Sequence, residues 1–182
     1  MKSPTSLIIY KYIDKAAFQV EKNAWITLYL DAFTSGELAQ CISEKEAENS
    51  LNDLVEKGRI LAAYFENQLA GCVIYFPFNQ HTTLSISDFP NINFSKTAYI
   101  AELMVKSNFR KKGIATTLLD KSLVDMKRNY ENAAIRVWDK NKKAIYLYEK
   151  KGFVPFTTIV QTKKRSETET FPMRKIYMIK NF

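Results

Sequence analysis

The sequence predicts an α/β fold in which helices flank a central mixed β-sheet. Short runs rich in Val, Ile, Tyr and Phe alternate with amphipathic segments of helical period, and glycine, proline or capping residues separate them. The expected order of elements is β-α-α-β-β-β-α-β-α-β-β. The length of 182 residues suffices for one sizeable core, so we expect a single domain over residues 1–182.

The first third of the chain predicts one strand and two helices. Residues 7–12 form an apolar run typical of a strand, and Asp14 is the expected N-cap of a helix that ends near residues 34–36. A capping box at Ser43 starts the second helix, which Gly58 ends. The first helix is expected to bury the apolar stripe Phe18, Trp25, Leu28 and Ala32.

A hairpin and a long connection follow these helices. Residues 59–66 and 69–76 are β-rich on either side of the dipeptide 67–68, which predicts a tight turn there. The polar stretch 78–97 is long for a connection, so it is either a functional lid or a flexible excursion, and we favour a lid. It holds His81, the only histidine, so the composition argues against a histidine-based triad or a site with several histidine ligands.

The second half predicts the rest of the sheet with two more helices. Gly113 opens a helix soon after a buried strand, Asn141 can cap a shorter one, and Gly152 ends that helix. The expected strands are 98–105, 133–138, 153–160 and 171–179, the expected helices are 113–129 and 141–151, and the polar segment 161–170 is the last hairpin loop.

The net charge of +8 is concentrated in the second half of the chain. Residues 1–97 carry 8 Lys and Arg against 11 Asp and Glu, whereas residues 98–182 carry 19 against 8. A basic half indicates an anionic partner. Nucleic acid, a phosphorylated cofactor and a solvated lysine surface all remain open on charge alone.

Composition also bears on compartment and redox chemistry. A mean hydropathy of −0.26, without any apolar run of about 18 residues, predicts no membrane span. The first residues lack a secretory pattern, so we expect a cytoplasmic protein. Cys41 and Cys72 have no metal-type spacing, and we expect two idle thiols and no metal site.

A basic turn between a strand and a helix is the most informative segment. The strand that ends at Val105 leads into residues 110–116, where Gly113 and Ala115 open a helix. The unpaired amides and partial positive charge of a helix N-terminus attract phosphate, and small residues let it approach. The segment is typical of a pyrophosphate cradle, although an ordinary strand-to-helix connection would also fit.

A second segment lies about 25 residues further along the chain. Asn141, Ala144 and Tyr148 share one face of the predicted helix, so a cap residue, a small residue and a phenol can line one slot. Without its neighbour this segment would favour a core helix.

Together the two segments resemble the GNAT superfamily of N-acetyltransferases. Arg110, Gly113 and Ala115 match the fixed positions of its cofactor signature, and residues 141–153 match its later pattern of Asn, Ala, Leu-Tyr-Glu-Lys and Gly-Phe. The resemblance extends over residues 99–153. It implies a GNAT-like acyl-CoA N-acyltransferase fold and direct transfer of an acetyl group from acetyl-CoA to a primary amine in a ternary complex.

The resemblance also implies which residues hold acetyl-CoA. Backbone groups of strand residues 103–105 would pair with the pantetheine arm, the amides of 111–116 would cradle the pyrophosphate, and Asn141 and Ala144 would flank the arm. Tyr148 would give its proton to the departing thiolate. The implied cofactor-binding residues are Leu103, Met104, Val105, Arg110, Lys111, Lys112, Gly113, Ile114, Ala115, Thr116, Asn141, Ala144 and Tyr148, with further positive charge from Lys142, Lys143 and Lys151.

The sequence leaves the general base open. Relatives often use a carboxylate on the same face as the Leu and Val of this strand, whereas strand alternation puts Glu102 on the other face and makes it a doubtful base. A strand bulge could re-aim Glu102, and the alternatives are a water relay, direct loss of the proton to solvent, and His81. The two expected faces are Tyr99, Ala101, Leu103 and Val105 on one side, and Ile100, Glu102 and Met104 on the other.

Two other functions remain as alternatives. A non-catalytic acyl-CoA-binding or sensor module would use the same fold but would not need Tyr148 as a proton donor. A nucleic-acid-binding domain would need a continuous basic stripe with exposed aromatics, whereas most aromatics here occupy core positions. The acceptor is not readable, since the stretches 34–42 and 78–97 expected to line its pocket show no dominant charge, and a homodimer stays open.

Overall fold

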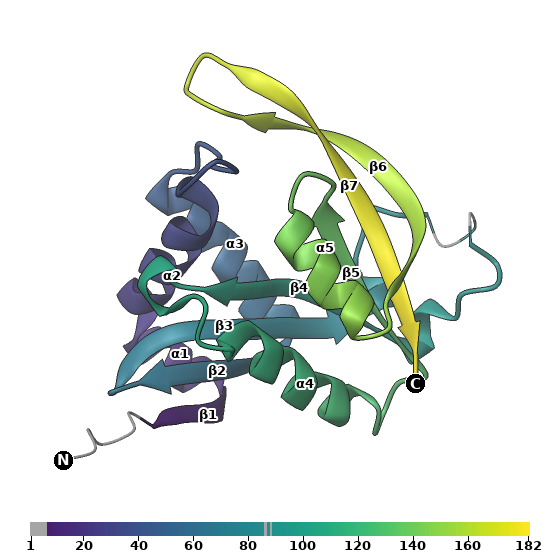
Figure 1. The fold of residues 1–182 in the computed structure, drawn as a ribbon, viewed down its shortest axis with the longest axis horizontal. Coiled ribbons are helices and arrows are strands. Elements are labelled where there is room, and N and C mark those ends of the chain that lie inside the picture. The colour runs from purple at the N-terminus through teal and green to yellow at the C-terminus, as the bar shows by residue number, and fades with distance from the viewer. Residues whose placement is uncertain (1–6, 86, 88) are drawn as a thin grey trace.

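The computed structural model describes residues 7–85, 87 and 89–182. Seven strands form one sheet in the order β1-β2-β3-β4-β5-β7-β6, with β4 and β5 parallel and the other neighbours antiparallel (Figure 1). The α/β class with a central mixed sheet is confirmed. The strands are β1 (Ile8–Ile13), β2 (Arg59–Phe65), β3 (Gln68–Pro77), β4 (Thr97–Val105), β5 (Asn132–Trp138), β6 (Val154–Lys164) and β7 (Thr170–Asn181), and the helices are α1 (Lys15–Val20), α2 (Lys22–Thr34), α3 (Glu44–Lys57), α4 (Ile114–Met126) and α5 (Lys142–Lys150).

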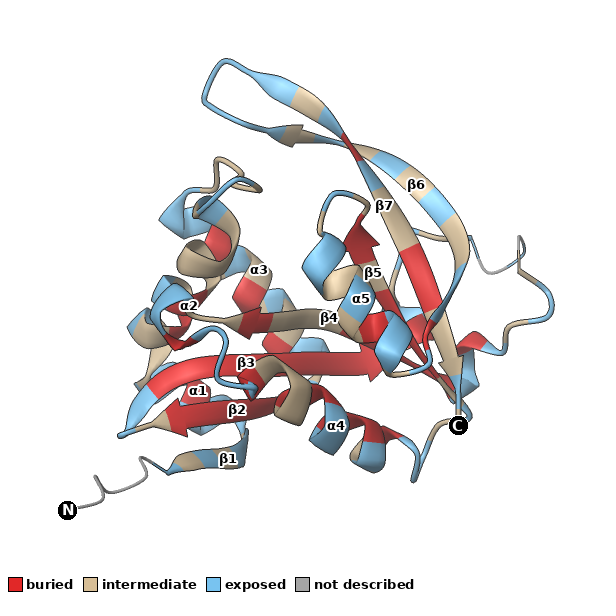
Figure 2. Ribbon diagram, viewed as in Figure 1, coloured by how far each residue is buried: buried red, intermediate tan, exposed pale blue. Residues whose placement is uncertain are grey.

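Helices cover both faces of the sheet. α4 and α5 pack on one face, here called the α4 face, through a cluster that includes Leu118 and Tyr148, and Figure 1 shows both helices on the near side. α1, α2 and α3 cover the opposite face, here called the α2 face, where Phe18 and Trp25 are fully buried. Between these layers β2 and β3 are buried along nearly all of their length (Figure 2).

Local sequence signals set most of the helix ends. The Ala17 amide donates to the Asp14 carboxylate at 2.8 Å, and Ser43 and Glu46 form both halves of the predicted capping box. The first predicted helix is divided into two, because the chain leaves helical geometry at Glu21, where φ is −104° and ψ is 19°. The apolar stripe runs through both pieces, which is why periodicity alone did not reveal the break.

Both hairpins differ in detail from their predictions. The first turn is formed by Glu66 and Asn67, with φ of 48° and 62°, one residue earlier than predicted. Two successive left-handed residues match the twist of the flanking strands. The last hairpin loop spans only residues 165–169, since β6 continues to Lys164 and β7 begins at Thr170. Residues 161–164 and 170, which the sequence predicts as loop, belong to these two strands. Their polarity reflects the solvent exposure of the strands and not a loop.

The connection between β3 and β4 is fixed at both of its ends. Phe78 and Phe94 are buried, and their ring centroids lie 4.6 Å apart. Phe78 also stacks on Tyr99 of β4, with centroids 5.0 Å apart. These contacts hold both ends of the 78–97 stretch in the core, and the interpretation of the residues between them as a lid stays a prediction.

Gly71 of β3 lies close to the backbone of β4, and its replacement tests that packing. A Cβ atom at this position would lie 2.5 Å from the Met104 carbonyl oxygen and 3.1 Å from a Val105 methyl group. Because the Met104 carbonyl belongs to the strand backbone, we expect Gly71→Ala to lower the free energy of unfolding by about 1–3 kcal/mol. Urea titration measures this, and Gln68→Ala at the exposed start of the same strand should change it by less than about 0.5 kcal/mol. Equal stability of both variants would contradict the close approach.

Candidate active site at the opening between β4 and β5

β4 and β5 separate half-way along the sheet. Their paired residues run only from Thr97–Asn132 to Ile100–Ile135, although β4 continues to Val105. β5 stays paired with β7 along its whole length, and β4 stays paired with β3 from Ala98 to Val105 except at Ala101. One edge of β4 beyond Ile100 therefore has no neighbouring strand, and an extended ligand can add to it through backbone hydrogen bonds.

The N-terminus of α4 lies next to this opening in sequence and has no side-chain cap. Gly113 is the N-cap residue, with φ of 75°, and no side chain there accepts from the first turn. The amides of residues 114–116 thus keep no intrahelical acceptor. A Cβ added at Gly113 would meet nothing within 4 Å, so the space in front of these amides is open. This geometry suits a phosphate group.

Arg110 holds the turn that precedes α4. Its Nε donates to the Val105 carbonyl at 3.2 Å, and its guanidinium lies 3.9 Å from the Asp31 carboxylate of α2. Asp31 also accepts from the Ser107 amide at 2.6 Å and from the Ser107 hydroxyl at 2.8 Å. The motif arginine therefore positions the loop, and Lys111, with φ of 63°, completes the bend toward the helix.

The lysines expected near the phosphates are not equivalent. Lys151 forms an ion pair with Asp120 of α4 at 2.6 Å, which ties the end of α5 to α4. Lys112 lies 5.4 Å from the centre of the Phe65 ring. Lys142 and Lys143, in the first turn of α5, are exposed. The part of the positive charge that stays free for an anion is thus smaller than the sequence indicated.

α5 supplies the residues expected on the other side of the opening. The Asn141 side-chain oxygen accepts from the Ala144 amide at 3.2 Å and caps the helix. Tyr148 is 6% exposed, and its ring lies 6.1 Å from that of Phe153. Burial first, and the charge of Glu102 second, raise the pKa of the Tyr148 phenol. The phenol is therefore protonated at neutral pH.

A bulge in β4 changes which side chains share a face. Ile74 pairs with Glu102 and Tyr75 with Ile100, so Ala101 has no partner on β3. Ile100 consequently packs on the α4 face with Leu103 and Val105, whereas Tyr99 and Ala101 pack on the α2 face. The expected grouping of Ile100 with Glu102, and of Tyr99 and Ala101 with Leu103 and Val105, is wrong, because the extra residue reverses the alternation once.

Glu102 lies in a group of charged and phenolic side chains on the α2 face. The charges of Lys175, Arg136 and Lys163 act on its carboxyl, and its own charge acts on the phenol of Tyr29 from α2. Burial outweighs the three cations and raises the pKa of the Glu102 carboxyl to about 7. Near neutral pH this group can therefore both accept and release a proton.

Sequence reasoning missed the three cations around Glu102. In β5, β6 and β7, Arg136, Lys163 and Lys175 occupy positions whose neighbours at alternate residues, such as Ala134, Ile159 and Tyr177, pack on the α2 face. A lysine or arginine at an inward-facing strand position was the available signal. This signal can be interpreted only once the register of the three strands is known.

His81 has a structural part in this group. Its Nε2 lies 2.8 Å from the Tyr177 hydroxyl, which also accepts from Arg136 Nη1 at 3.2 Å. Burial, together with the charge of Arg136, lowers the pKa of His81 to about 3. The neutral imidazole is hydrogen-bonded to the Tyr177 hydroxyl and so helps to orient Arg136, and a role as general base has no support in this arrangement.

The chain matches the family described as "Acetyltransferase (GNAT) family" over residues 22–153, most of its length. The chain belongs to this family. Solved N-acetyltransferases share its fold: an N-acetyltransferase from Staphylococcus aureus Mu50 has 16% identity and a TM-score of 0.71 over 97% of this chain and 99% of that one. Ribosomal-protein-alanine N-acetyltransferase from Brucella melitensis has 20% identity and a TM-score of 0.66, over 96% and 99% of the two chains.

A further GNAT family structure bears on the cofactor. The acetyltransferase from Elizabethkingia anophelis, described with acetyl-CoA bound, has 18% identity and a TM-score of 0.63 over 96% of this chain and 98% of that one. In the GNAT chain described here, the free edge of β4 and the uncapped amides of α4 provide the two features that a pantetheine arm and a pyrophosphate need. The residues present therefore fit acetyl-CoA.

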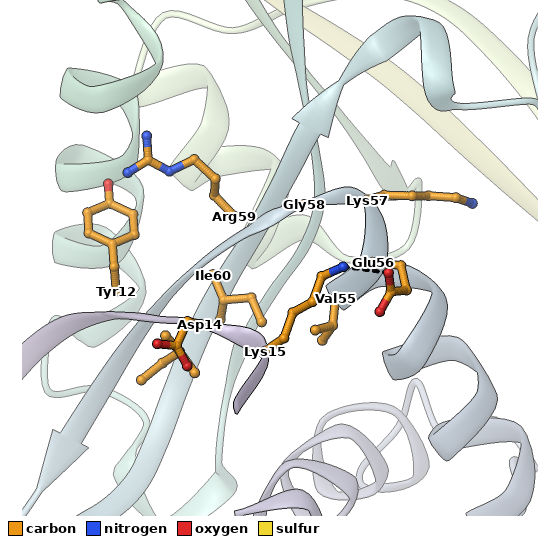
Figure 3. A pocket seen from close by; sticks show the side chains of 10 residues that line it. Tyr12, Asp14, Lys15, Val55, Glu56, Lys57, Gly58, Arg59 and Ile60 are labelled. Atoms are coloured by element: carbon orange, nitrogen blue, oxygen red, sulfur yellow. Dashed lines mark hydrogen bonds and ion pairs between the residues drawn. The ribbon is translucent and has the colours of Figure 1, made fainter. Parts of the chain in front are cut away.

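Two surface recesses of this GNAT protein lie away from the opening. One, of about 340 Å³, is lined by residues of β1, α3 and β2, and an ion pair of 2.5 Å between Lys15 and Glu56 borders it (Figure 3). The other, of about 470 Å³, lies between Tyr10 and α4. Neither contains a residue of the site. Within residues 7–85, 87 and 89–182, no three His, Cys, Asp or Glu side chains form a metal-type group, and no helix is long and apolar enough to cross a membrane.

Gly113 offers a test of the phosphate cradle with a matched control. A carboxylate at this N-cap position would accept from the first-turn amides and place a negative charge where the pyrophosphate is expected. We expect Gly113→Asp to weaken CoA binding at least about tenfold more than Gly113→Asn, which has the same shape and backbone strain without the charge. Calorimetry measures both affinities. Equal affinities of the two variants for CoA would place the phosphates elsewhere.

Proposed function

We propose that this protein transfers an acetyl group from acetyl-CoA directly to a primary amine in a ternary complex. The observation that carries the proposal is the opening between β4 and β5, with a buried phenol on one face of the sheet and a carboxyl of raised pKa on the other. Tyr148 belongs to the α4 face, and Glu102 lies among side chains of the α2 face. The acetyl donor and the amine thus approach from opposite faces.

Acetyl-CoA supplies the thioester that reacts. The backbone of Leu103, Met104 and Val105 would hold the pantetheine arm along the free edge of β4, and the amides from Lys111 to Thr116 would hold the pyrophosphate. Asn141 and Ala144 would flank the arm from α5. Fixing the donor in this way lets the amine attack without a loss of translational freedom at that step.

Tyr148 is proposed as the proton donor to the departing sulfur. A free thiol has a pKa of about 8.5 and a free phenol about 10. The burial that raises the pKa of Tyr148 also disfavours a bare thiolate beside it, so the sulfur takes the proton as its bond to carbon breaks. The ring contact with Phe153 holds the phenol in place.

Glu102 is proposed as the proton acceptor from the amine. An ammonium group with a pKa near 10 must lose a proton before it can attack. The Glu102 carboxyl has a pKa raised to about 7, so it is largely ionised at slightly alkaline pH and basic enough to take that proton. The bulge at Ala101 leaves Glu102 on the face opposite Tyr148, where the acceptor would enter.

Direct transfer is favoured over an acyl-enzyme route. Cys72 is the cysteine on β3 near this site, and its side chain is fully buried on the α2 face. Burial, together with the charge of Glu102, raises the pKa of the Cys72 thiol. A buried neutral thiol is a poor nucleophile, so Cys72 is unsuited to carry the acetyl group as a thioester intermediate.

Tyr148→Phe tests the proton donor. The substitution keeps the ring and its packing and removes only the hydroxyl, so we expect kcat to fall roughly 10²- to 10⁴-fold while the Kd for CoA changes little. Steady-state CoA release and a CoA titration measure the two quantities. Tyr146→Phe is the control on the same helix, because Tyr146 is 59% exposed. Wild-type kcat in Tyr148→Phe would return this residue to a purely structural role.

Glu102→Gln tests the proton acceptor through its pH profile. The ionised carboxylate is the active form, so wild-type kcat should rise tenfold per pH unit below about 7 and level off above it. The variant should lose this rise of kcat with pH, together with most of its kcat. Its stability at pH 8 should be equal or higher, since a buried charge is removed. Glu131→Gln, at an exposed position, is the control. A rise of kcat below about pH 7 that survives in Glu102→Gln would assign the titration to another group.

A further inference from the structure

Three cationic side chains converge on the α2 face where the amine is expected to enter. Arg136 lies directly opposite Tyr177 in the β5–β7 register, and Lys175 is two residues from Tyr177 along β7. Lys175 also pairs with Ile159 of β6, four residues before Lys163. Strand alternation therefore places Arg136, Lys163 and Lys175 on one face of three neighbouring strands.

These cations have little negative charge to balance them. None of the three forms an ion pair within the part of the chain that the structure describes. Glu102 is the carboxylate that acts on all three, and Glu46 acts more weakly on Lys163 alone. Each cation is only partly exposed. Burial, together with mutual repulsion, lowers the pKa of Lys175 to about 7 and also that of Lys163.

The surroundings of the cluster favour a small ligand. The Cys41 amide donates to the Lys164 carbonyl at 3.0 Å, so the loop between α2 and α3 is tied to the end of β6. Figure 1 shows the β6–β7 hairpin reaching over the sheet toward that loop. Gln161, opposite Met173 on the same face as Lys163, has a buried amide oxygen without a hydrogen-bond partner among the described residues. An N–H donor of a ligand would satisfy it.

We propose that the acetyl acceptor is a small amine that also carries a carboxylate or phosphate, and that Arg136, Lys163 and Lys175 bind this anion beside Glu102. The inference rests on the proposed function and specifies its substrate class. Tyr177 and His81 orient the Arg136 guanidinium, which suits the paired oxygens of either anion. The anion offsets the repulsion among the cations, and its attachment fixes the amine near Glu102.

Pairs of amines with and without an anionic group test this substrate class. The value of kcat/KM is measured from CoA release for β-alanine against its amide, and for phosphoethanolamine against ethanolamine. We expect the anionic member of at least one pair to be favoured about tenfold or more, and the favoured pair identifies the anion as carboxylate or phosphate. Equal use of the charged and neutral members in both pairs would overturn the proposal.

Two pairs of adjacent residues supply matched variants. Lys163→Gln and Lys175→Gln should each lower the preference about tenfold, whereas Lys164→Gln and Arg174→Gln, which remove the same charge on the opposite face, should leave it unchanged. The intrinsic reactivities of the amines are the same in every variant, so the change in preference isolates the effect of the site. An equal loss of this preference in the control variants would show that it arises from the overall charge of the protein, and would refute a specific anion-binding site.

Equilibrium binding separates this inference from the proposed function. Absence of both CoA binding and CoA release with every amine would contradict the proposed function. Calorimetry of the same amine pairs, with and without CoA, measures the preference for the anion independently of turnover. Tighter binding of an anionic member, lost in Lys175→Gln and kept in Arg174→Gln, supports the cationic site, and the lack of any charge preference in binding overturns it.

Discussion

The separation of β4 from β5 is the constraint on which the rest of the site depends. Four paired positions hold these parallel strands together, and beyond Ile100 each keeps only its antiparallel partner. A sheet without this opening would pair the backbone hydrogen-bonding groups along the β4 edge with β5 and would separate the two faces completely. The opening instead leaves one edge of β4 without a strand partner, and in the proposed mechanism Tyr148 and Glu102 act through it from opposite faces of the sheet.

The electrostatics of the α4 side and the α2 side differ, and the two sides therefore suit different ligands. On the α4 side the attraction comes mainly from backbone amides at the uncapped helix start, which suits a phosphate without regard to pH. On the α2 side the charges are those of side chains: Arg136, Lys163 and Lys175 are cationic and would attract an anion, and Glu102 is a carboxyl whose pKa burial raises. Crowding like charges costs stability, and such a cost is typical of functional sites.

Aromatic packing provides the stiffness that this arrangement needs. Phe78, Tyr99, Tyr177 and His81 form one cluster near the start of β4 and toward the end of β7, with the centroids of the His81 and Tyr99 rings 4.1 Å apart. Through Tyr177 the cluster reaches Arg136, so residues at the start of the 78–97 connection help to hold this charged side chain in place. Buried hydrogen bonds between aromatic side chains are directional, and they restrict the guanidinium more than apolar contact alone would.

The sequence by itself determined the features that depend on residues close together along the chain. The caps at Asp14 and Ser43, the glycine turn before α4 and the placement of Tyr148 on α5 follow from interactions three or four residues apart, and they are found in the structure. Only the tertiary structure decided what depends on cross-strand register: the bulge at Ala101, and the grouping of Arg136, Lys163 and Lys175 on one face. One unpaired residue reverses the facing of every later side chain in a strand, and pairing between distant segments is what selects that residue.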